Sequence, residues 1–389
     1  MKIAIVGYGT AGQAAAIFLA RAGHAIEMFE RSAELKPVGA GFLLQPTGLG
    51  VMSALGLHDA AVERGARIDR LHGENAAGRM VMDMGYADHA RDSFGLGMTR
   101  GALFTLLHAA CVDAVSIHTA IRIVAISADG RSILDDAGHE YGPFDLIVAA
   151  DGASSALRAA STLAIRDPLY PWGAMWCLLP ADGWPHVAEL RQRYAGTRTM
   201  LGVLPVGMRP DVGGRWLTFY YSLRGARIDT FDTEALAQLQ SDVAGLWPEL
   251  AERTHALTDP AQLNRARYRD VVLKQPWHDR TVFIGDAAHG MSPQLGQGVN
   301  MALLDAEALA TALAEHTEIP RAFERYAGLR RRHVAVYQHL SRWLTPLFQS
   351  DSRLLAPLRD RVFGPFGKLP LARREMLKIL TGTKRGWLH

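Results

Sequence analysis

Short, almost wholly apolar runs in this chain are followed by glycine turns and then by apolar residues at helical spacing. Lys2–Val6, Leu146–Ala150 and Thr281–Ile284 are runs of the kind that fills a buried parallel strand. After the last of them, apolar residues recur every three or four positions over Val299–Glu315, which predicts a helix. Strands that alternate with helices indicate an α/β sheet, and ligands of such sheets bind at the carboxyl ends of the strands.

The first strand leads into a glycine-rich loop. Gly7-Tyr8-Gly9-Thr10-Ala11-Gly12 precedes a helix through Ala22, and a second strand, Ala25–Phe29, ends in Glu30. The glycines let a pyrophosphate approach the helix N-terminus, and an acidic side chain at the end of the second strand can hold both ribose hydroxyls of an adenosine. Because Glu30 would repel a 2′-phosphate, the loop favours FAD or NAD over NADP. The alternative is a glycine turn in some other α/β protein.

A carboxylate and a glycine-rich loop follow the last buried strand. Gly285 ends this strand, so Asp286 lies at its carboxyl end. Pro293 stiffens the connection, while Gly296 and Gly298 lack the side chains that would keep a flat ligand away from the backbone. The following helix directs its free N–H groups and about half a positive charge back across the loop. The segment therefore predicts a site that holds a sugar hydroxyl and stabilises a nearby anion.

Three further segments are candidates for ligand contacts. Asp151-Gly152-Ala153-Ser154-Ser155-Ala156-Leu157-Arg158 again places an acid at the end of a strand, before a glycine turn and a helix start. Arg100 lies near the start of a predicted helix, Leu103–Cys111, where an acidic residue is usual. It indicates an anionic partner such as a phosphate, with a plain surface arginine as the alternative. Gly39–Gly48 is a strand-like segment that we expect beside the ligand.

Between about Asp167 and Gln275 the pattern changes, because polar and apolar residues alternate and tryptophans appear. This alternation predicts a second, largely antiparallel layer with one helix, Thr233–Leu246, bounded by Pro248. The predicted strands of this layer are Trp172–Leu179, Thr199–Pro205 and Trp216–Leu223; other strands are predicted within Val62–Met84 and as an antiparallel pair over Val115–Ile126 and Ser132–Tyr141. The residues that could line an apolar pocket are Trp172, Met175, Trp176, Met200, Phe219, Tyr220 and Tyr221, although each one alone is better explained as core.

Length and composition are those of an ordinary globular protein. A chain of 389 residues favours two domains, and 49% apolar with 21% charged residues excludes a disordered or membrane protein. Cys111 and Cys177 supply neither a disulfide framework nor a metal-ligand spacing, so we expect a reducing, cytoplasmic compartment and no metal. We expect no signal peptide, because Met1-Lys2 runs straight into the first strand, and no membrane span, because no apolar run is long enough.

Positive charge is concentrated near the end of the chain. From Arg330 onward there are 13 Lys and Arg against 3 Asp and Glu, a net charge of +10, although the whole chain carries only +3. A solvated helical tail packed on the body of the protein or on a second subunit explains this asymmetry, and contact with an anionic membrane surface is the alternative. We find no helix-turn-helix, zinc or RNA-binding signature that suggests nucleic acid.

Three motifs occur in one order: the Gly7–Gly12 loop with Glu30, Asp151-Gly152 through Arg158, and Gly285-Asp286 through Asn300. In this order they resemble the class A, single-component FAD-dependent aromatic hydroxylases, the flavoprotein monooxygenases typified by para-hydroxybenzoate and salicylate hydroxylases. The resemblance spans roughly residues 1 to 340. The cofactor-binding residues that it implies are Gly7, Gly9, Gly12, Glu30, Arg31, Arg100, Asp151, Arg158, Asp286, Pro293, Gly296, Gly298, Val299 and Asn300.

The resemblance also implies a role for each part of the cofactor site. Glu30 would bind the adenosine ribose, Arg100 the FAD phosphates or ribityl chain, and Asp286 the ribityl chain. Gly296–Asn300 would offer backbone N–H groups to the N1 and C2 carbonyl side of the flavin. The segment Asp151–Arg158 would serve both FAD and the nicotinamide cofactor.

The implied fold is an α/β, Rossmann-like FAD-binding domain of the GR2 type with an inserted, mostly antiparallel β-sheet substrate domain and a C-terminal helical segment. The FAD-binding domain would be discontinuous, over residues 1–70, 97–166 and 276–330. The substrate domain would comprise residues 71–96 and 167–275, and the helical region residues 331–389. This helical region is too short and too basic for the thioredoxin-like domain of the largest relatives.

The implied chemistry is hydroxylation of a small aromatic or heteroaromatic substrate. NADH or NADPH would transfer a hydride to FAD, and the helix N-terminus would stabilise the reduced flavin, which is anionic at N1. O₂ would then form a flavin C4a-hydroperoxide, whose distal oxygen passes to an electron-rich ring in a dry pocket. The candidates for a base or hydrogen-bond acceptor that activates the substrate are Tyr220, Tyr221, Gln45 and His289.

Two other functions fit the same motifs. A flavin-dependent reductase or dehydrogenase of this fold would not insert oxygen, and a nucleotide-binding sensor would catalyse no reaction. No second glycine fingerprint marks a nicotinamide site, so the sequence does not distinguish NADH from NADPH. We expect a monomer or a homodimer.

Overall fold

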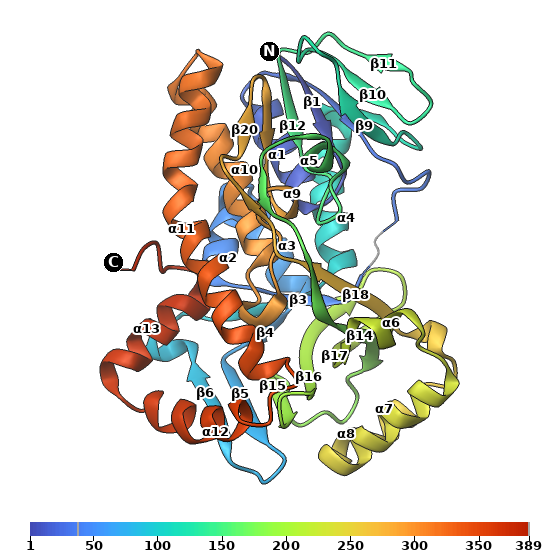
Figure 1. Cartoon of the computed structure of the whole chain (residues 1–389), viewed down its shortest axis with the longest axis vertical. Coiled ribbons are helices and arrows are strands. Elements are labelled where there is room, and N and C mark those ends of the chain that lie inside the picture. The colour runs from blue at the N-terminus through green and yellow to red at the C-terminus, as the bar shows by residue number, and fades with distance from the viewer. Residues whose placement is uncertain (37–38, 388–389) are drawn as a thin grey trace.

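The computed structural model describes residues 1–36 and 39–387. Along its long axis the molecule has an upper part built on a six-stranded sheet and a lower part built on a seven-stranded sheet, with the C-terminal helices along one side (Figure 1). Within these described ranges, no helix is both long enough and apolar enough to cross a lipid bilayer.

The six-stranded sheet has the order β20-β21-β12-β1-β2-β8 and is parallel except for the short pair β20–β21. Its strands are β1 (Lys2–Val6), β2 (Ala25–Phe29), β8 (Ser116–His118), β12 (Leu146–Ala149), β20 (Trp277–His278) and β21 (Thr281–Phe283). One face packs against α1 (Thr10–Arg21), α4 (Arg100–Cys111) and α10 (Gly298–Glu315). The other face packs against a small sheet and α5 (Ala156–Ala160). Because both faces are covered, the central strands β1, β12 and β21 are mainly apolar, as the sequence predicts.

Smaller elements surround this sheet. One three-stranded sheet consists of β9 (Ile123–Ile126), β10 (Ile133–Asp135) and β11 (Glu140–Tyr141), and another of β3 (Gly41–Leu44), β7 (Gly95–Thr99) and β4 (Ala66–Ile68). The remaining short elements are α2 (Pro46–Ala54), α3 (His58–Arg64), α9 (Asp286–His289), β13 (Ala164–Arg166) and β19 (Val272–Leu273). The sheet β3-β7-β4 lies against the lower part, where β7 contacts β16.

The seven-stranded sheet has the order β18-β14-β17-β16-β15-β5-β6 and is antiparallel apart from the parallel pair β15–β5. Its strands are β5 (Arg70–Asn75), β6 (Met80–Gly85), β14 (Leu169–Pro180), β15 (Glu189–Ala195), β16 (Thr199–Arg209), β17 (Gly213–Arg224) and β18 (Asn264–Arg269). Its outer face packs on α7 (Thr233–Leu246) and α8 (Pro248–His255), next to the short α6 (Gly225–Asp229). Its inner face turns toward β3, because Gly41 donates its backbone N–H to the Thr218 hydroxyl of β17 at 2.7 Å.

Three helices complete the chain: α11 (Ile319–Phe348), α12 (Leu355–Phe366) and α13 (Pro370–Thr381). Long α11 runs beside α10, and α12 and α13 lie below it, next to β6 (Figure 1). The expected boundary after residue 330 falls inside α11. The two segments assigned to a substrate domain supply the strands of one sheet, and the division into domains stays a prediction.

Two predictions of local structure were wrong. The start of Val115–Ile126 does not pair with Ser132–Tyr141: β8 joins the six-stranded sheet beside β2, and Ala120, at φ +59°, turns the chain before β9. Val62 lies in helix α3 rather than in a strand. Helix α7 has the predicted bounds, and Pro248 beyond it opens a further helix, α8, because proline is tolerated in the first turn of a helix.

Candidate functional site

The loop after β1 lies in close contact with the end of β12 and with the start of α1. Gly7 has φ +105°, and a Cβ there would lie 2.4 Å from the Ala150 carbonyl oxygen; a Cβ at Gly12 would lie 2.1 Å from the Gly7 carbonyl oxygen. By contrast, a Cβ at Gly9 would meet no heavy atom within 4 Å. Helix α1 begins just after Gly9 with no side-chain cap and no acid in its first turn. Its first N–H groups therefore face open space that suits a diphosphate.

Glu30 lies beside this loop at the end of β2. Its carboxylate accepts hydrogen bonds from the Tyr8 and Ser32 backbone N–H groups, both at 2.9 Å. These bonds fix the carboxylate next to the glycines, where the sequence predicts an adenosine ribose. Arg31, the next residue, is exposed to solvent.

Asp286 is the exposed first residue of α9, and two buried charged residues fix the backbone around it. The Gly285 N–H donates to the Asp305 carboxylate at 2.8 Å. Arg158, with only 1% of its surface exposed, donates to the Ala287 carbonyl at 3.0 Å and to Asp167 at 3.0 Å. The Arg158 guanidinium is thus engaged by protein acceptors, so it positions the backbone of α9.

The start of α10 faces the Asp286 side chain. A Cβ built on Gly298 would have a single near neighbour, Asp286 Oδ1 at 3.8 Å, and one built on Gly296 would have none within 4 Å. Gly296 has φ +61°, a left-handed conformation that glycine adopts without strain. Pro293 opens the short turn before it, and Val299 is half-buried. Helix α10 has no side-chain cap and no acid in its first turn, so its N–H groups are directed at the same space as Asp286.

Asn300 fastens a third segment to this helix start. Its side chain is fully buried; its oxygen accepts the Gln45 N–H at 2.8 Å, and its nitrogen donates to the Leu43 carbonyl at 3.2 Å. The Gln45 side chain is also buried, and its oxygen accepts a hydrogen bond from the Tyr86 hydroxyl at 2.6 Å. Gln45 therefore lies next to α10, and the expected position of the Gly39–Gly48 segment beside a ligand stays a prediction.

Asp151 lies beside the Gly7 loop, and Arg100 lies beside Gly39. Asp151 Oδ2 accepts the Leu157 N–H at 3.3 Å, while Oδ1 is buried and has no hydrogen-bond partner within the described residues. Arg100 is exposed at the start of α4, and its N–H donates to the Ala40 carbonyl at 3.0 Å. Ligand contacts by Asp151 and Arg100 stay predictions.

His289 belongs to a buried ionic cluster. Its Nε2 lies 2.5 Å from Asp305 Oδ2, and Arg330 Nε donates to Asp305 Oδ1 at 2.7 Å. Burial alone raises the pKa of Asp305, but the neighbouring His289 and Arg330 hold that pKa well below its usual range. The His289 ring is only 5% exposed, so we do not retain it as the substrate base.

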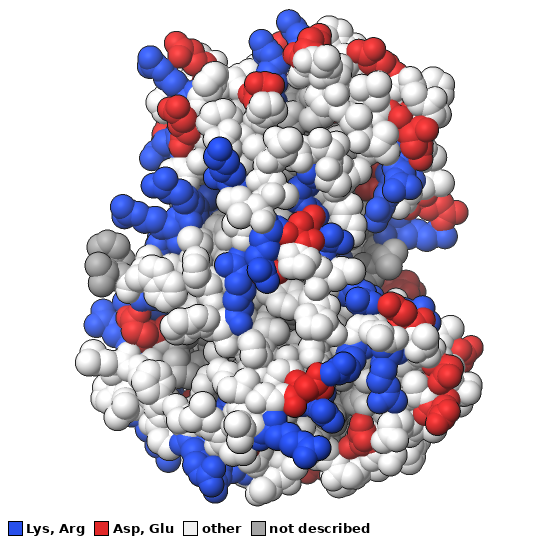
Figure 2. Space-filling model, in the orientation of Figure 1, with Lys and Arg blue, Asp and Glu red and all other residues white. Residues whose placement is uncertain are grey.

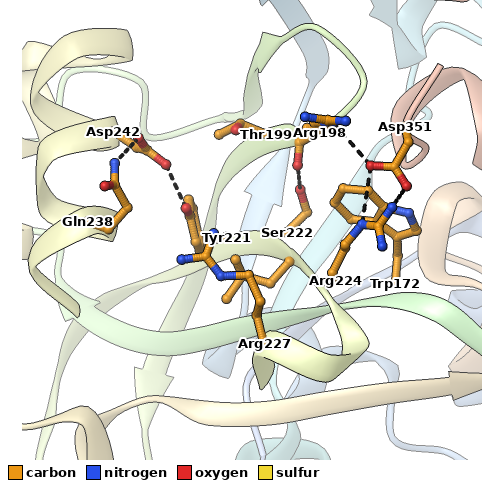
Figure 3. Close-up of a pocket in the computed structure, with 11 residues that line it drawn as sticks. Trp172, Arg198, Thr199, Tyr221, Ser222, Arg224, Arg227, Gln238, Asp242 and Asp351 are labelled. Atoms are coloured by element: carbon orange, nitrogen blue, oxygen red, sulfur yellow. Dashed lines mark hydrogen bonds and ion pairs between the residues drawn. The ribbon is translucent and has the colours of Figure 1, made fainter. Parts of the chain in front are cut away.

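Tyr220 and Tyr221 lie on opposite faces of β17, because successive residues of a strand alternate. Tyr221 packs in the outer core, and its hydroxyl donates to Asp242 of α7 at 2.6 Å. It lines a cavity of about 360 Å³ at the outer edge of the sheet, together with Trp172 and Arg227 (Figure 3). Tyr220 shares the inner face with Thr218 and packs against Tyr194, Met200 and Phe348. Of this pair, only Tyr220 is retained as a candidate.

Sequence reasoning missed Asp305 and Arg330. Asp305 is a carboxylate on the apolar side of α10, beside Ala302, Leu303 and Ala306, where a charge is costly unless it is paired. A single carboxylate within this apolar pattern was the sequence signal that could have indicated a buried ion pair. Its partner lies 25 residues away on α11, so the sequence pattern could not identify it.

The two uncapped helix starts, the open space beside Gly9 and Gly298, and the carboxylates of Glu30 and Asp286 fit an extended dinucleotide with a flat ring system. Apart from Asp286, no described side chain outside the chain neighbours lies within 4 Å of a Cβ on Gly298, so there is space beside the start of α10, which we call the cofactor crevice. FAD fits this arrangement of residues.

Comparison with known proteins supports this assignment. The family described as "FAD binding domain" matches residues 1–337. A probable 2-heptyl-3-hydroxy-4(1H)-quinolone synthase of Rhodococcus erythropolis is 27% identical over 94% of this chain and 91% of its own. The aurachin C monooxygenase/isomerase of Stigmatella aurantiaca is 29% identical over 85% of each chain.

Among solved structures, Klebsiella pneumoniae HpxO complexed with FAD and uric acid has the same fold. The TM-score is 0.82 at 21% identity, and the alignment covers 100% of this chain and 98% of that one. The chain therefore belongs to the FAD binding domain family and is an FAD-dependent monooxygenase of the single-component aromatic hydroxylase type.

Proposed function

We propose that this protein hydroxylates a small aromatic or heteroaromatic compound with O₂ and with NADH or NADPH as the reductant. The observation that carries the proposal is the position of the Asp286 carboxylate beside Gly298, at the open and uncapped start of α10. A carboxylate that holds a ribityl hydroxyl would thus lie next to N–H groups that stabilise an anionic ring. Bound FAD would supply hydride acceptance and O₂ activation.

The residues of the loops would hold the cofactor in two places. Gly7, Gly9 and Gly12 allow the diphosphate to reach the start of α1, and Glu30 lies where the adenosine ribose would be held. At the other end, the start of α10 would carry the flavin ring. Arg100, exposed and next to the Gly39–Gly48 segment, would contact the phosphates or the ribityl chain.

The inner face of the seven-stranded sheet would hold the substrate. Tyr220 lies over Gly202 of the neighbouring strand, where a Cβ would come within 2.6 Å of its ring. Burial raises the pKa of Tyr220 well above its ordinary value, and Tyr268 and Tyr194 add to the shift. The phenol therefore keeps its proton at neutral pH and donates a hydrogen bond rather than acting as a base. Gln45 would supply a polar contact from the α10 side.

The names of the relatives favour the same substrate class. They include a quinolone synthase, a 3-hydroxybenzoate 6-hydroxylase and a urate hydroxylase. We therefore propose a phenolic or nitrogen-containing ring that is electron-rich at the position attacked. The choice of reductant, a cytoplasmic location and a monomeric or homodimeric state stay predictions.

The test begins with the purified protein, which should be yellow and retain FAD. Phenolic acids, hydroxypyridines, quinolones and quinone precursors are then screened for stimulated NADH or NADPH oxidation, and products for the gain of one oxygen atom. Labelled O₂ separates hydroxylation from the alternative, a reductase or dehydrogenase that inserts no oxygen. A colourless protein that does not take up FAD would contradict the whole proposal.

A further inference from the structure

Helix α12 and the start of α13 expose an apolar surface, which we call the α12–α13 face. Its exposed apolar residues are Leu354 (82%), Leu358 (55%), Val362 (45%), Phe366 (49%), Leu369 (56%) and Leu371 (79%). The first four recur at every fourth position, so they form one stripe along α12. In Figure 2 the surface over these helices, at the lower left, is mainly uncharged, with Lys and Arg side chains along its lower edge.

Basic residues flank this stripe, and the exposed acid just before it, Asp351, is paired with Arg198 and Arg224. Arg353, Arg361, Lys368 and Arg374 are exposed, and none of the four has a salt bridge within residues 39–387. The acids of the two helices are engaged elsewhere: Asp360 pairs with Arg359 and accepts from Asn75, and Glu375 pairs with Lys378 and Lys384. The α12–α13 face therefore combines apolar side chains with unpaired positive charge.

The opposite sides of these helices are fixed to the body of the protein. Phe363 packs edge-on against Phe348 with ring centroids 6.0 Å apart, and Arg359 donates to the Leu347 carbonyl at 3.0 Å. Leu377 and Leu380 are buried against the inner face of the seven-stranded sheet. Because of these contacts the helices cannot turn their apolar stripe inward, so the exposed face is preformed.

We propose that the α12–α13 face docks on the surface of an anionic phospholipid bilayer. A helix with an apolar stripe and flanking Lys or Arg lies in the plane of the membrane interface, with its apolar side chains among the acyl chains. Its cations are attracted to the anionic headgroups. A second copy of the chain is a poorer occupant, because a two-fold contact would bring the same four cations together.

The end of α13 links the helix that carries part of this face to the cofactor-binding part of the protein. Gln297, the residue before α10, donates its side-chain amide to the Leu380 carbonyl of α13 at 2.8 Å. Thr47 of α2 donates to the Thr381 carbonyl at 3.3 Å. The end of α13 is thus hydrogen-bonded both to the residue before α10 and to α2. The docking itself does not depend on which reaction the protein catalyses.

The test uses the FAD-loaded full chain and vesicle sedimentation. We expect binding to vesicles of equal parts phosphatidylcholine and phosphatidylglycerol, much weaker binding to pure phosphatidylcholine, and loss of binding at high salt. Arg361→Gln and Lys368→Gln should each lower the partition coefficient about fivefold. Leu358→Glu with Phe366→Glu should lower it by about tenfold or more, because two apolar side chains no longer enter the bilayer.

The matched control is Val212→Glu, which changes an exposed apolar residue (60%) in the turn between β16 and β17, far from α12 in the sequence. It should leave vesicle binding unchanged, and all variants should keep their flavin spectrum and thermal midpoint. Equal binding to both kinds of vesicle, or full binding by the Leu358→Glu/Phe366→Glu variant, would overturn the proposal. So would a dimer that this variant converts to a monomer in sedimentation velocity, with no vesicle binding by the wild type. Retained FAD would show that such a failure leaves the proposed function intact.

Discussion

The Asp305 carboxylate, in the middle of α10, accepts a 2.8 Å hydrogen bond from the backbone N–H of Gly285. The same carboxylate binds His289 and Arg330, so one buried anion joins the end of β21, α9, α10 and α11. Gly285 immediately precedes Asp286, the exposed carboxylate proposed to hold the ribityl chain. The buried Asp305 carboxylate thus fixes the backbone that carries the exposed Asp286 carboxylate.

Asp305→Asn should destabilise the protein strongly. The substitution keeps the shape but leaves the Arg330 cation buried without its counter-charge, which costs about 3–5 kcal/mol in unfolding free energy. Urea denaturation of the FAD-loaded protein measures this change. Asp136→Asn, at an exposed carboxylate, is the control and should have no effect. Equal stability of the two variants would show that the cluster does not stabilise the fold.

Stability should also decrease as the pH falls below neutrality, partly because of His333. Burial, with the Arg330 cation, lowers the pKa of His333 to about 3, whereas it is about 6.5 in the unfolded chain. Between these values the unfolded chain binds more protons, so the unfolding free energy falls as pH falls, by about 1.4 kcal/mol per pH unit from this residue. Asp305, whose folded pKa is lowered, stabilises above about pH 4 and loses that contribution below it.

His333→Gln should remove the upper part of this pH dependence. Glutamine can still accept the hydrogen bond that Arg330 donates to His333 Nδ1 at 2.9 Å, but it does not titrate. Urea denaturation of both proteins between about pH 6.5 and pH 4.5 should show a smaller slope for the variant. Parallel curves would mean that folding does not lower the pKa of His333.

Asp286→Ala should abolish FAD retention without unfolding the chain. Its side chain is exposed, so its removal leaves no buried group unpaired, but the ribityl hydroxyls lose a charged acceptor. We expect FAD affinity to fall by about tenfold or more, as for a hydrogen bond to a charged group worth about 1.5–3 kcal/mol. Flavin fluorescence on titration with FAD gives the dissociation constant. Unchanged affinity would remove the central support for the cofactor site.

Gly298→Val and Gly12→Val should have different consequences. A side chain at Gly298 would approach only Asp286 Oδ1, at 3.8 Å, so the protein should fold but exclude the flavin ring. A side chain at Gly12 would lie 2.1 Å from the Gly7 carbonyl oxygen and should disrupt the fold itself. Circular dichroism and flavin absorbance separate these outcomes. Normal FAD binding by Gly298→Val would place the ring elsewhere.

Tyr220→Phe and Tyr221→Phe form a matched pair on opposite faces of β17. The Tyr220 change should keep FAD and lower substrate-stimulated turnover by about tenfold, for one lost hydrogen bond. The Tyr221 change should leave turnover intact and lower stability by about 1 kcal/mol, because Asp242 loses one of its two donors and keeps the Gln238 amide. Steady-state rates with the substrate found by screening provide the measurement. The reverse pattern would place the substrate on the outer face.

The sequence predicted the cofactor-binding units because their signals are local. A buried strand, a glycine turn and a helix with apolar spacing lie within about thirty residues of one another. Helix Thr233–Leu246 and strand Ala25–Phe29 were predicted with the bounds that the structure has. Val115–Ile126 was misassigned, because its first part pairs with β2, far away in the chain.

By itself, then, the sequence determined the α/β units, the positions of Glu30, Asp286 and Gly298, and the family that these motifs indicate. Only the tertiary structure decided which of Tyr220 and Tyr221 lies on the inner face of the seven-stranded sheet and that Asp305 is paired. The physical reason is that a strand's two faces become different only when other elements cover them, and a buried charge is stable only beside a partner brought from elsewhere in the chain.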